Sequence, residues 1–273
     1  MDSSLLRGFE RVSVPLCTLI NGNRHPRGPL LMLTRYLSGP AIYEVTRRRL
    51  HVHGADHVRK LNPARGILVL SNHRSFFDMY VALSWVYVNA DFVTRLHFPV
   101  RSNFFYTNPL GLVVNLAISG CAMWPPVFRD ERRTLLNPTG VTQTLHVLDQ
   151  KGCMVGIHPE GTRSQDPDPY RFLPARPGVG VMVSRTHPET VILPYFVAGL
   201  SNSFAEEMKC NLRPRQSEPL RVWYGEPVLA GEAATWGDPQ AIADGLMARI
   251  GVEAEKDRAY RPTIGLGAPP VIR

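Results

Sequence analysis

The sequence lacks an uninterrupted apolar run as long as a membrane-spanning helix requires, which is about 20 residues. Its longest apolar stretches are residues 109–127 and 79–90, and Asn115 together with several glycines and prolines interrupts the first. The first fifteen residues carry two acidic and two basic side chains and no apolar block follows, so we expect no signal peptide. We therefore expect any contact with a bilayer to lie at its surface.

Cysteine is scarce, and no C-x-x-C pair occurs among Cys17, Cys121, Cys153 and Cys210. This spacing predicts reduced thiols of a cytoplasmic protein rather than a disulfide framework or a zinc site. The G-x-S-x-G motif of many serine hydrolases is also missing, and none of the four cysteines has the surroundings of a nucleophile. A catalytic nucleophile of either type is therefore not expected.

Composition predicts one large α/β domain. The chain has 273 residues, 44% of them hydrophobic, which is enough for a sizeable core. The formal net charge of +8 favours an anionic partner, either a membrane surface or a substrate. Nucleic acid is not expected as a partner, because the basic residues are scattered and form no nucleic-acid-binding motif.

A candidate catalytic pair follows an apolar segment. Residues 66–70 read as a buried strand, and His73 comes directly after its end, where open α/β sheets place their chemistry. Asp78 falls in the first turn of the next apolar segment, from which a carboxylate can orient one imidazole nitrogen and leave the other to accept a proton. This is a base with its orienting group but without a nucleophile of its own. The attacking group is therefore expected to belong to a substrate.

A second motif, His158-Pro159-Glu160-Gly161-Thr162-Arg163-Ser164, lies downstream. With Asn72-His73-x4-Asp78 it resembles the first and third sequence blocks of the glycerolipid acyltransferases, the HX4D superfamily that includes the 1-acylglycerol-3-phosphate acyltransferases. Residues 191–196 resemble the fourth block, and Phe128-Arg129 resembles the end of the second, although Gly120 lies farther upstream than usual. The resemblance covers roughly residues 45–230.

The resemblance implies an O-acyltransferase of phospholipid biosynthesis. Its acyl donor would be acyl-CoA or acyl-carrier protein, and its acceptor a lysophospholipid, above all 1-acylglycerol 3-phosphate, which gives phosphatidic acid. No cofactor is implied beyond the donor. The enzyme would act as a peripheral or monotopic protein on the cytoplasmic face of an anionic membrane.

Particular residues are assigned roles on this basis. We predict that His73 is the general base and Asp78 its orienting partner. The resemblance places Glu160, Gly161 and Thr162 at the acceptor site, with Glu160 in a positioning role because its charge makes it a poor phosphate ligand. The guanidinium groups of Arg129 and Arg163 suit a phosphate. Three further residues of the matching blocks are weaker candidates, namely Asn72, Arg176 and Gly178.

Each candidate also has a purely structural interpretation. His73 could be an ordinary histidine at a strand end, and Gly161 could serve only the geometry of a turn. Arg129 could belong to a solvated charge run over residues 129–133, and residues 176–178 could be an ordinary helix entry. The H-x-H pair of His51 and His53 puts both rings on one face of a strand, but no completing ligand is evident, so no metal is expected.

Other functions stay open. Within the same reaction class, the acceptor could be another lysophospholipid, a lyso-aminolipid or a glycolipid, or the protein could be a transacylase like tafazzin. A non-catalytic lipid-binding or membrane-anchoring protein is the alternative of another class. The intact pair of His73 and Asp78 disfavours it, because a binding module has no need of a general base.

Alternating apolar segments predict a mixed, largely parallel sheet flanked by helices. Residues 1–45 are predicted to form a helical membrane-associating segment, 46–261 the acyltransferase domain and 262–273 a flexible tail. The apolar residues 29–37 and the basic residues 47–49 suit an interfacial helix, although a helix packed on the core is an alternative. Strands are expected near 49–53, 66–70, 113–118, 153–157, 191–197 and 220–224, and helices near 75–88 with Ser75 as cap, 139–150, 179–186 and 239–259.

Overall fold

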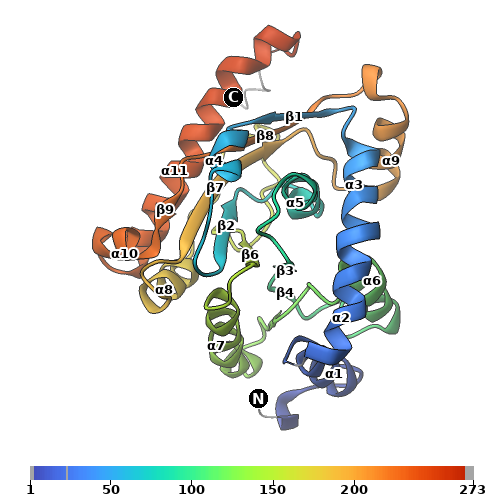
Figure 1. Cartoon of the computed structure of the whole chain (residues 1–273), viewed down its shortest axis with the longest axis vertical. Coiled ribbons are helices and arrows are strands. Elements are labelled where there is room, and N and C mark those ends of the chain that lie inside the picture. The colour runs from blue at the N-terminus through green and yellow to red at the C-terminus, as the bar shows by residue number, and fades with distance from the viewer. Residues whose placement is uncertain (1–2, 23, 268–273) are drawn as a thin grey trace.

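The computed structural model of the chain describes residues 3–22 and 24–267 and shows a mixed β-sheet with helices on both faces (Figure 1). The strand order in the main sheet is β1-β8-β7-β2-β6-β3, with β9 paired to β7, while β4 and β5 form a small separate sheet. The strands are β1 Leu50–His53, β2 Ile67–Ser71, β3 Arg95–His97, β4 Val100–Arg101, β5 Pro126–Val127, β6 Cys153–Ile157, β7 Val191–Ala198, β8 Leu220–Tyr224 and β9 Val228–Leu229.

The central strands of the main sheet are parallel. β2 runs parallel to both β6 and β7, so that Leu70 lies opposite Ile157 on one side and Pro194 on the other. β3 continues the parallel set beyond β6, whereas β8 and β9 are antiparallel to β7. The predicted fold class is therefore confirmed, and the carboxyl ends of β2 and β6 meet at one edge of the sheet.

The central strands are nearly continuous apolar runs because both faces of the sheet are covered. Every residue of β2 and of β7 is buried. Pro194 lies in the middle of β7, where a missing N–H would normally cost a ladder hydrogen bond. It is accommodated because β9 pairs with Val191 and Ile192, whereas β8 pairs only from Tyr195 onward.

Helices form a layer on each side of the sheet (Figure 1). α5 packs between the sheet and α3, and α7, α8 and α11 cover the opposite face, so that each face has its own apolar core cluster. The α-helices after the N-terminal region are α4 Ala55–Arg59, α5 Asp78–Asn89, α6 Pro109–Ser119, α7 Asn137–Leu148, α8 Pro177–Arg185, α9 Phe204–Leu212, α10 Ala230–Ala233 and α11 Pro239–Tyr260, and the 3-10 helices are η3 Arg133–Leu136, η4 Pro214–Gln216, η5 Ala234–Trp236 and η6 Arg261–Ile264.

Most predicted elements are present, but the strand predicted at 113–118 is wrong. These residues belong to α6, which begins after Asn108, whose side chain accepts a hydrogen bond from the amide of Leu110 at 2.9 Å. Pro109 occupies the first turn, and Gly120 ends the helix in a left-handed conformation at φ +58°. These are ordinary helix start and stop signals, which outweighed the β-branched residues between them.

The cap predicted for the helix after His73 is also wrong. α5 begins at Asp78 rather than near Ser75, and Phe77 is its N-cap residue. The hydroxyl of Ser75 instead accepts from the amide of Phe77 at 3.1 Å and donates to the carbonyl of Ser201 at 2.6 Å. Asp78 itself, in the first turn, takes over the role of accepting backbone amides.

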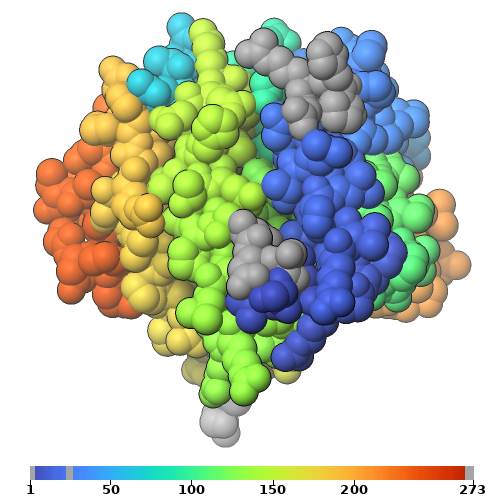
Figure 2. Space-filling model, turned by 90° about the horizontal axis from the view of Figure 1, so that it is seen from below, coloured from blue at the N-terminus to red at the C-terminus, as the bar shows by residue number. Residues whose placement is uncertain are grey.

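The N-terminal region is helical, as predicted, and consists of η1 Ser3–Leu5, α1 Glu10–Gly22, α2 Arg24–Leu33, the π-helix η2 Thr34–Ser38 and α3 Gly39–Thr46. It packs on the rest of the molecule, and Figure 2 shows the N-terminal helices in blue beside the green of α6. Val14 and Cys17 of α1 join the main core, and Glu10 pairs with Arg133 at 2.6 Å. No helix among the described residues combines the length and apolarity needed to cross a bilayer.

The basic residues after α3 and the C-terminal segment differ in part from what the sequence predicts. Arg49 is not part of an exposed basic cluster, because it is buried and bonded to Glu207 at 3.2 Å and Asn211 at 2.8 Å. Arg47 and Arg48 are exposed. The segment predicted as a flexible tail starts in the 3-10 helix η6, and its residues 268–273 lie outside the described part of the chain. The proposed division at residue 45 stays a prediction.

Candidate active site

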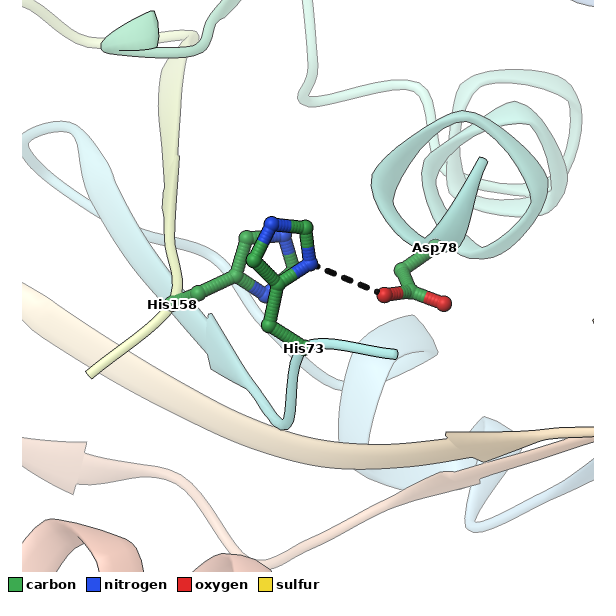
Figure 3. A group of neighbouring side chains, drawn as sticks. All are labelled: His73, Asp78 and His158. Atoms are coloured by element: carbon green, nitrogen blue, oxygen red, sulfur yellow. Dashed lines mark hydrogen bonds and ion pairs between the residues drawn. The ribbon is translucent and has the colours of Figure 1, made fainter. Parts of the chain in front are cut away.

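His73 and Asp78 lie at the carboxyl end of β2, as Figure 3 shows, and their side chains are hydrogen-bonded. Nδ1 of His73 is 3.1 Å from Oδ2 of Asp78. Because the carboxylate accepts, Nδ1 carries the proton and Nε2 keeps its lone pair. Among the described residues none hydrogen-bonds this Nε2, and His73 is partly exposed, so the nitrogen is available to a substrate.

Asp78 is held in place by backbone amides. Its Oδ2 also accepts from the amides of Arg74 and Ser75, each at 2.8 Å. The side chain is fully buried, and burial raises the pKa of Asp78 to about 6, against the lowering effects of His158 and of the two amide bonds. At neutral pH the group is a carboxylate, which is the form that orients His73.

His73 is a neutral imidazole at pH 7. Burial, followed by the positive charges of Arg163 and then Arg129, lowers the pKa of His73 to about 4. A general base must be unprotonated to act, and this environment keeps it so over the physiological range. Both arginines predicted to bind phosphate therefore act on the protonation of His73.

Glu160 connects the two sequence motifs. It is buried, with 1% of its surface exposed, and its Oε1 accepts from the amide of His73 at 2.7 Å. Its Oε2 accepts from the amide of Leu173 at 2.8 Å. Glu160 thus ties the loop of the candidate base to the segment after the second motif, and this is the geometry expected of a positioning residue.

Asn72 also has a positioning geometry. Its side-chain nitrogen donates to the carbonyl of Val197 at 2.9 Å, and its oxygen accepts from the amide of the same residue at 2.9 Å. The side chain therefore pairs with β7 as a strand backbone would. Asn72 is fully buried, and its weaker candidacy as a site residue stays a prediction.

His158 is a neighbour of His73 to which the sequence analysis assigned no role. The two imidazole rings are stacked, with centroids 3.8 Å apart and planes inclined by 6° (Figure 3). Nδ1 of His158 lies 2.9 Å from the carbonyl oxygen of Asn72, so it carries a proton and donates. Burial and the neighbouring His73 lower the pKa of His158 to about 3, which makes it a neutral ring. Its position at the end of β6, directly before Pro159, was the signal in the sequence that could have placed it beside His73.

The ligand atoms of His73, Asp78 and His158 lie within 4.8 Å of one another, a spacing that a metal ion could bridge. The donor geometry does not suit an ion. Lone pairs of imidazole lie in the ring plane, and two parallel stacked rings cannot both direct them at one ion about 2 Å away. Arg129 and Arg163 also place positive charge beside the group. The histidines first considered for metal, His51 and His53, instead contact Tyr260 and Trp223.

Basic side chains gather beside His73. The guanidinium of Arg129 donates to the carbonyl of Gly161, and burial followed by the charges of Arg101 and Arg176 lowers the pKa of Arg129. Arg163 is exposed and donates to Asn202 at 3.0 Å. Arg163 and Arg129 thus act on the charge of His73, and Arg101, which the sequence analysis missed, acts together with Arg176 on that of Arg129.

The rest of the second motif lines this region. Gly161 has φ +68°, which favours glycine, and a Cβ there would lie 3.4 Å from the Arg176 side chain. Thr162 is partly exposed beside Arg163, and Gly178 is exposed in the first turn of α8. Arg74, to which the sequence analysis gave no role, holds the loop that follows the second motif. Its guanidinium donates to the carbonyl of Asp166 and, at 3.0 Å, to that of Asp168.

Comparisons with known proteins agree with this geometry. A protein-family model described as "Acyltransferase" matches residues 49–198, more than half of the chain. The fold is similar to the crystal structure of the 1-acyl-sn-glycerophosphate (LPA) acyltransferase, PlsC, from Thermotoga maritima, with a TM-score of 0.53 and 17% identity over 94% of this chain and 86% of that one. A search of curated proteins found no match.

Proposed function

Because the chain belongs to the acyltransferase family, we propose that it transfers a fatty acyl group from acyl-CoA or acyl-carrier protein to the hydroxyl of a lysophospholipid. The observation that carries this proposal is a neutral His73 whose Nδ1 is bonded to Asp78 and whose Nε2 is hydrogen-bonded by no described residue. A base of this kind, without a nucleophile beside it, fits a reaction in which the second substrate supplies the attacking oxygen.

The reaction then proceeds without a covalent enzyme intermediate. Nε2 of His73 takes the proton of the acceptor hydroxyl while that oxygen attacks the thioester carbonyl, and the Asp78 carboxylate stabilises the imidazolium. The tetrahedral intermediate collapses with loss of the thiolate, which takes the proton back from the imidazolium. Ester and free thiol are the products, and every proton is accounted for without a cofactor or metal.

The acceptor we favour is 1-acylglycerol 3-phosphate, with phosphatidic acid as product. Arg163 and Arg129 lie near His73, and Arg101 and Arg176 lie near Arg129, so a phosphomonoester beside the base would face several cations. PlsC, which has a similar fold, is itself described as an LPA acyltransferase. A lysophospholipid without an accessible phosphomonoester would make poorer use of these arginines.

We also propose that the protein works on the cytoplasmic face of an anionic membrane. α2 and η2 expose Met32, Tyr36 and Leu37 to solvent, and Arg47 and Arg48 follow in the chain. Apolar side chains, an aromatic ring and nearby cations suit the headgroup region of an anionic leaflet.

The reaction is tested by thiol release from palmitoyl-CoA and oleoyl-CoA in detergent micelles, with lysophosphatidic acid, lysophosphatidylcholine, lysocardiolipin or no acceptor. We expect release that requires lysophosphatidic acid and falls by about 10²- to 10⁴-fold in His73→Ala. His146→Ala, which removes an exposed histidine of α7, is the matched control and should keep full activity.

The other outcomes separate the alternatives. Release with a different acceptor would keep the mechanism and replace the substrate. This outcome would favour the hypotheses of a lyso-aminolipid or glycolipid acceptor, or of a tafazzin-like transacylase. Binding of lysolipid without turnover of any donor, including acyl-carrier protein, would contradict the proposal and favour a non-catalytic lipid-binding protein.

Membrane contact is tested separately by sedimentation with anionic liposomes. We expect the double variant Met32→Gln/Leu37→Gln to sediment several-fold less than the unaltered protein, because it removes apolar area without touching the core. Val252→Gln, at an exposed position of α11, is the control. Deleting residues 1–45 is a poorer test, because α1 contributes Val14 and Cys17 to the core. Equal sedimentation of all three proteins would place the contact elsewhere.

A further inference from the structure

A cavity lies behind α5. α5, the N-terminal segment α2–η2–α3 and α6 enclose a cavity of about 40 Å³. Since one water molecule needs roughly 10–15 Å³ measured in this way, the cavity has room for a carboxylate group, and a longer alkyl chain attached to it would run out of the cavity toward the surface. Its lining combines apolar side chains, such as Leu83 and Phe98, with Arg27 and His97.

Arg27 of α2 carries a buried charge. Its side chain is 6% exposed, and Nη2 donates to Oδ1 of Asn21 at 3.2 Å and approaches Nε2 of His97 at 3.4 Å. No carboxylate of the described residues forms an ion pair with it, and the nearby charge of Arg95 has the same sign. A buried guanidinium in apolar surroundings is costly unless an anion is close.

His97 adds a second donor that lacks an acceptor. Because Nε2 faces the Arg27 guanidinium, it accepts, and the ring proton is on Nδ1. This Nδ1 is buried and has no hydrogen-bond partner among the described residues. His97 is 2% exposed, and burial together with Arg27 and Arg95 lowers its pKa to about 3, so the ring stays neutral. Buried donors of this kind normally have acceptors, and here both belong to one cavity lining.

We propose that this cavity binds an alkyl carboxylate, with its carboxylate on the Arg27 guanidinium and its chain along the apolar wall. The lining runs from the buried Arg27 to Ile118 of α6, which is 45% exposed, so the cavity reaches the surface beside an apolar residue. A single cation suits a monoanion, and apolar walls favour an alkyl chain over a hydrated inorganic ion. The site is distinct from the arginines around His73 and does not depend on acyl transfer.

Isothermal titration calorimetry on the full chain, without any acyl donor, tests this proposal. Octanoate is the probe, and octan-1-ol and inorganic phosphate are compared with it. We expect octanoate to bind with a stoichiometry of one, and octan-1-ol at least tenfold more weakly because it lacks the charge. Arg27→Met should weaken octanoate at least tenfold, whereas the matched variant Arg35→Met, on η2 outside this cavity lining, should bind as the unaltered protein does.

A second variant covers the possibility that Arg27→Met disturbs the fold. Ile118→Trp adds bulk at a partly exposed position of the lining, and we expect it to weaken octanoate several-fold while butyrate is little affected. Circular dichroism and thermal melting of each variant establish that it is folded. Equal binding of octanoate and octan-1-ol, tighter binding of phosphate, or unchanged affinity in a folded Arg27→Met protein would each overturn the proposal.

Discussion

The candidate active site and the cavity behind α5 bury charges in opposite ways. Around His73, the Asp78 carboxylate accepts from the amides of Arg74 and Ser75, and Glu160 accepts from those of His73 and Leu173. In the cavity, Arg27 and His97 offer donors for which the described part of the chain supplies no anionic acceptor. A buried charge that backbone amides satisfy can hold a reactive group in position. A buried charge that is left unsatisfied points to a missing ligand.

The largest effect on this comparison should come from Asp78→Asn. The asparagine fits the same space, but its amide nitrogen would face donors, so His73 loses its orienting acceptor and can take the wrong tautomer. We expect kcat to fall by about 10²- to 10⁴-fold with a nearly unchanged KM. Thiol-release kinetics measure this, and an active Asp78→Asn enzyme would show that the pair does not work as a unit.

Neutralising one buried charge should have opposite effects in the two regions. The Glu160 carboxylate accepts from two backbone amides, and in Glu160→Gln the side-chain nitrogen would face one of these N–H donors and leave it without an acceptor. We expect this substitution to lower the free energy of unfolding by about 1–3 kcal/mol. Arg27→Met removes an unpaired charge and should leave the melting temperature unchanged or higher. Denaturant titration of both, with the exposed Glu206→Gln as control, decides the matter. A large loss of stability in Arg27→Met would mean that its charge is satisfied in the folded protein.

Arg163→Gln should affect the acceptor and the base together. Loss of a charged hydrogen-bond donor is expected to raise KM for lysophosphatidic acid roughly tenfold, with little change for the acyl donor. His73 is active when unprotonated, so activity falls as the pH drops through its pKa, and removing the charge of Arg163 should move this acidic limb to higher pH. A pH profile of kcat/KM without such a shift would place Arg163 away from the base.

The smallest effect should come from the ring beneath His73. His158→Phe keeps an aromatic ring for stacking but loses the bond to the carbonyl of Asn72. We expect kcat to fall only a few-fold, whereas His158→Ala, which also opens a gap under His73, should lower it further. If both variants have equal rates and pH profiles, stacking does not orient the base.

The sequence predicted the site better than it predicted what surrounds it. His73 and Asp78 are five residues apart, and Glu160 belongs to a distinctive motif, so local pattern and family resemblance were enough to select them. His158 stood in the same motif but was passed over, since stacking is a tertiary contact. Arg101 belongs to the two-residue strand β4 and Arg74 to the segment between β2 and α5, and no periodicity reveals where either lies relative to His73.

The remaining errors have similar causes. The strand predicted at 113–118 was chosen for its β-branched residues, while the capping residues Asn108 and Gly120 carried the stronger signal. Arg49 resembled its exposed neighbours in sequence, but it is buried against Glu207, 158 residues away. Arg27 and His97 are 70 residues apart, and only the packing of α2 near β3 brings them together. Such pairs cannot be read from spacing.

The side-chain amide of Asn72 limits the length of the segment that carries His73. Its side chain takes the place of a backbone peptide against Val197 and so extends β2 by one residue, which frees the chain to turn at His73. Two anchors, at Asn72 and at Asp78, thereby fix the length of the connecting segment. Insertion of a single residue between them should therefore be far less tolerated than an insertion in an exposed surface loop, because no slack exists to absorb it.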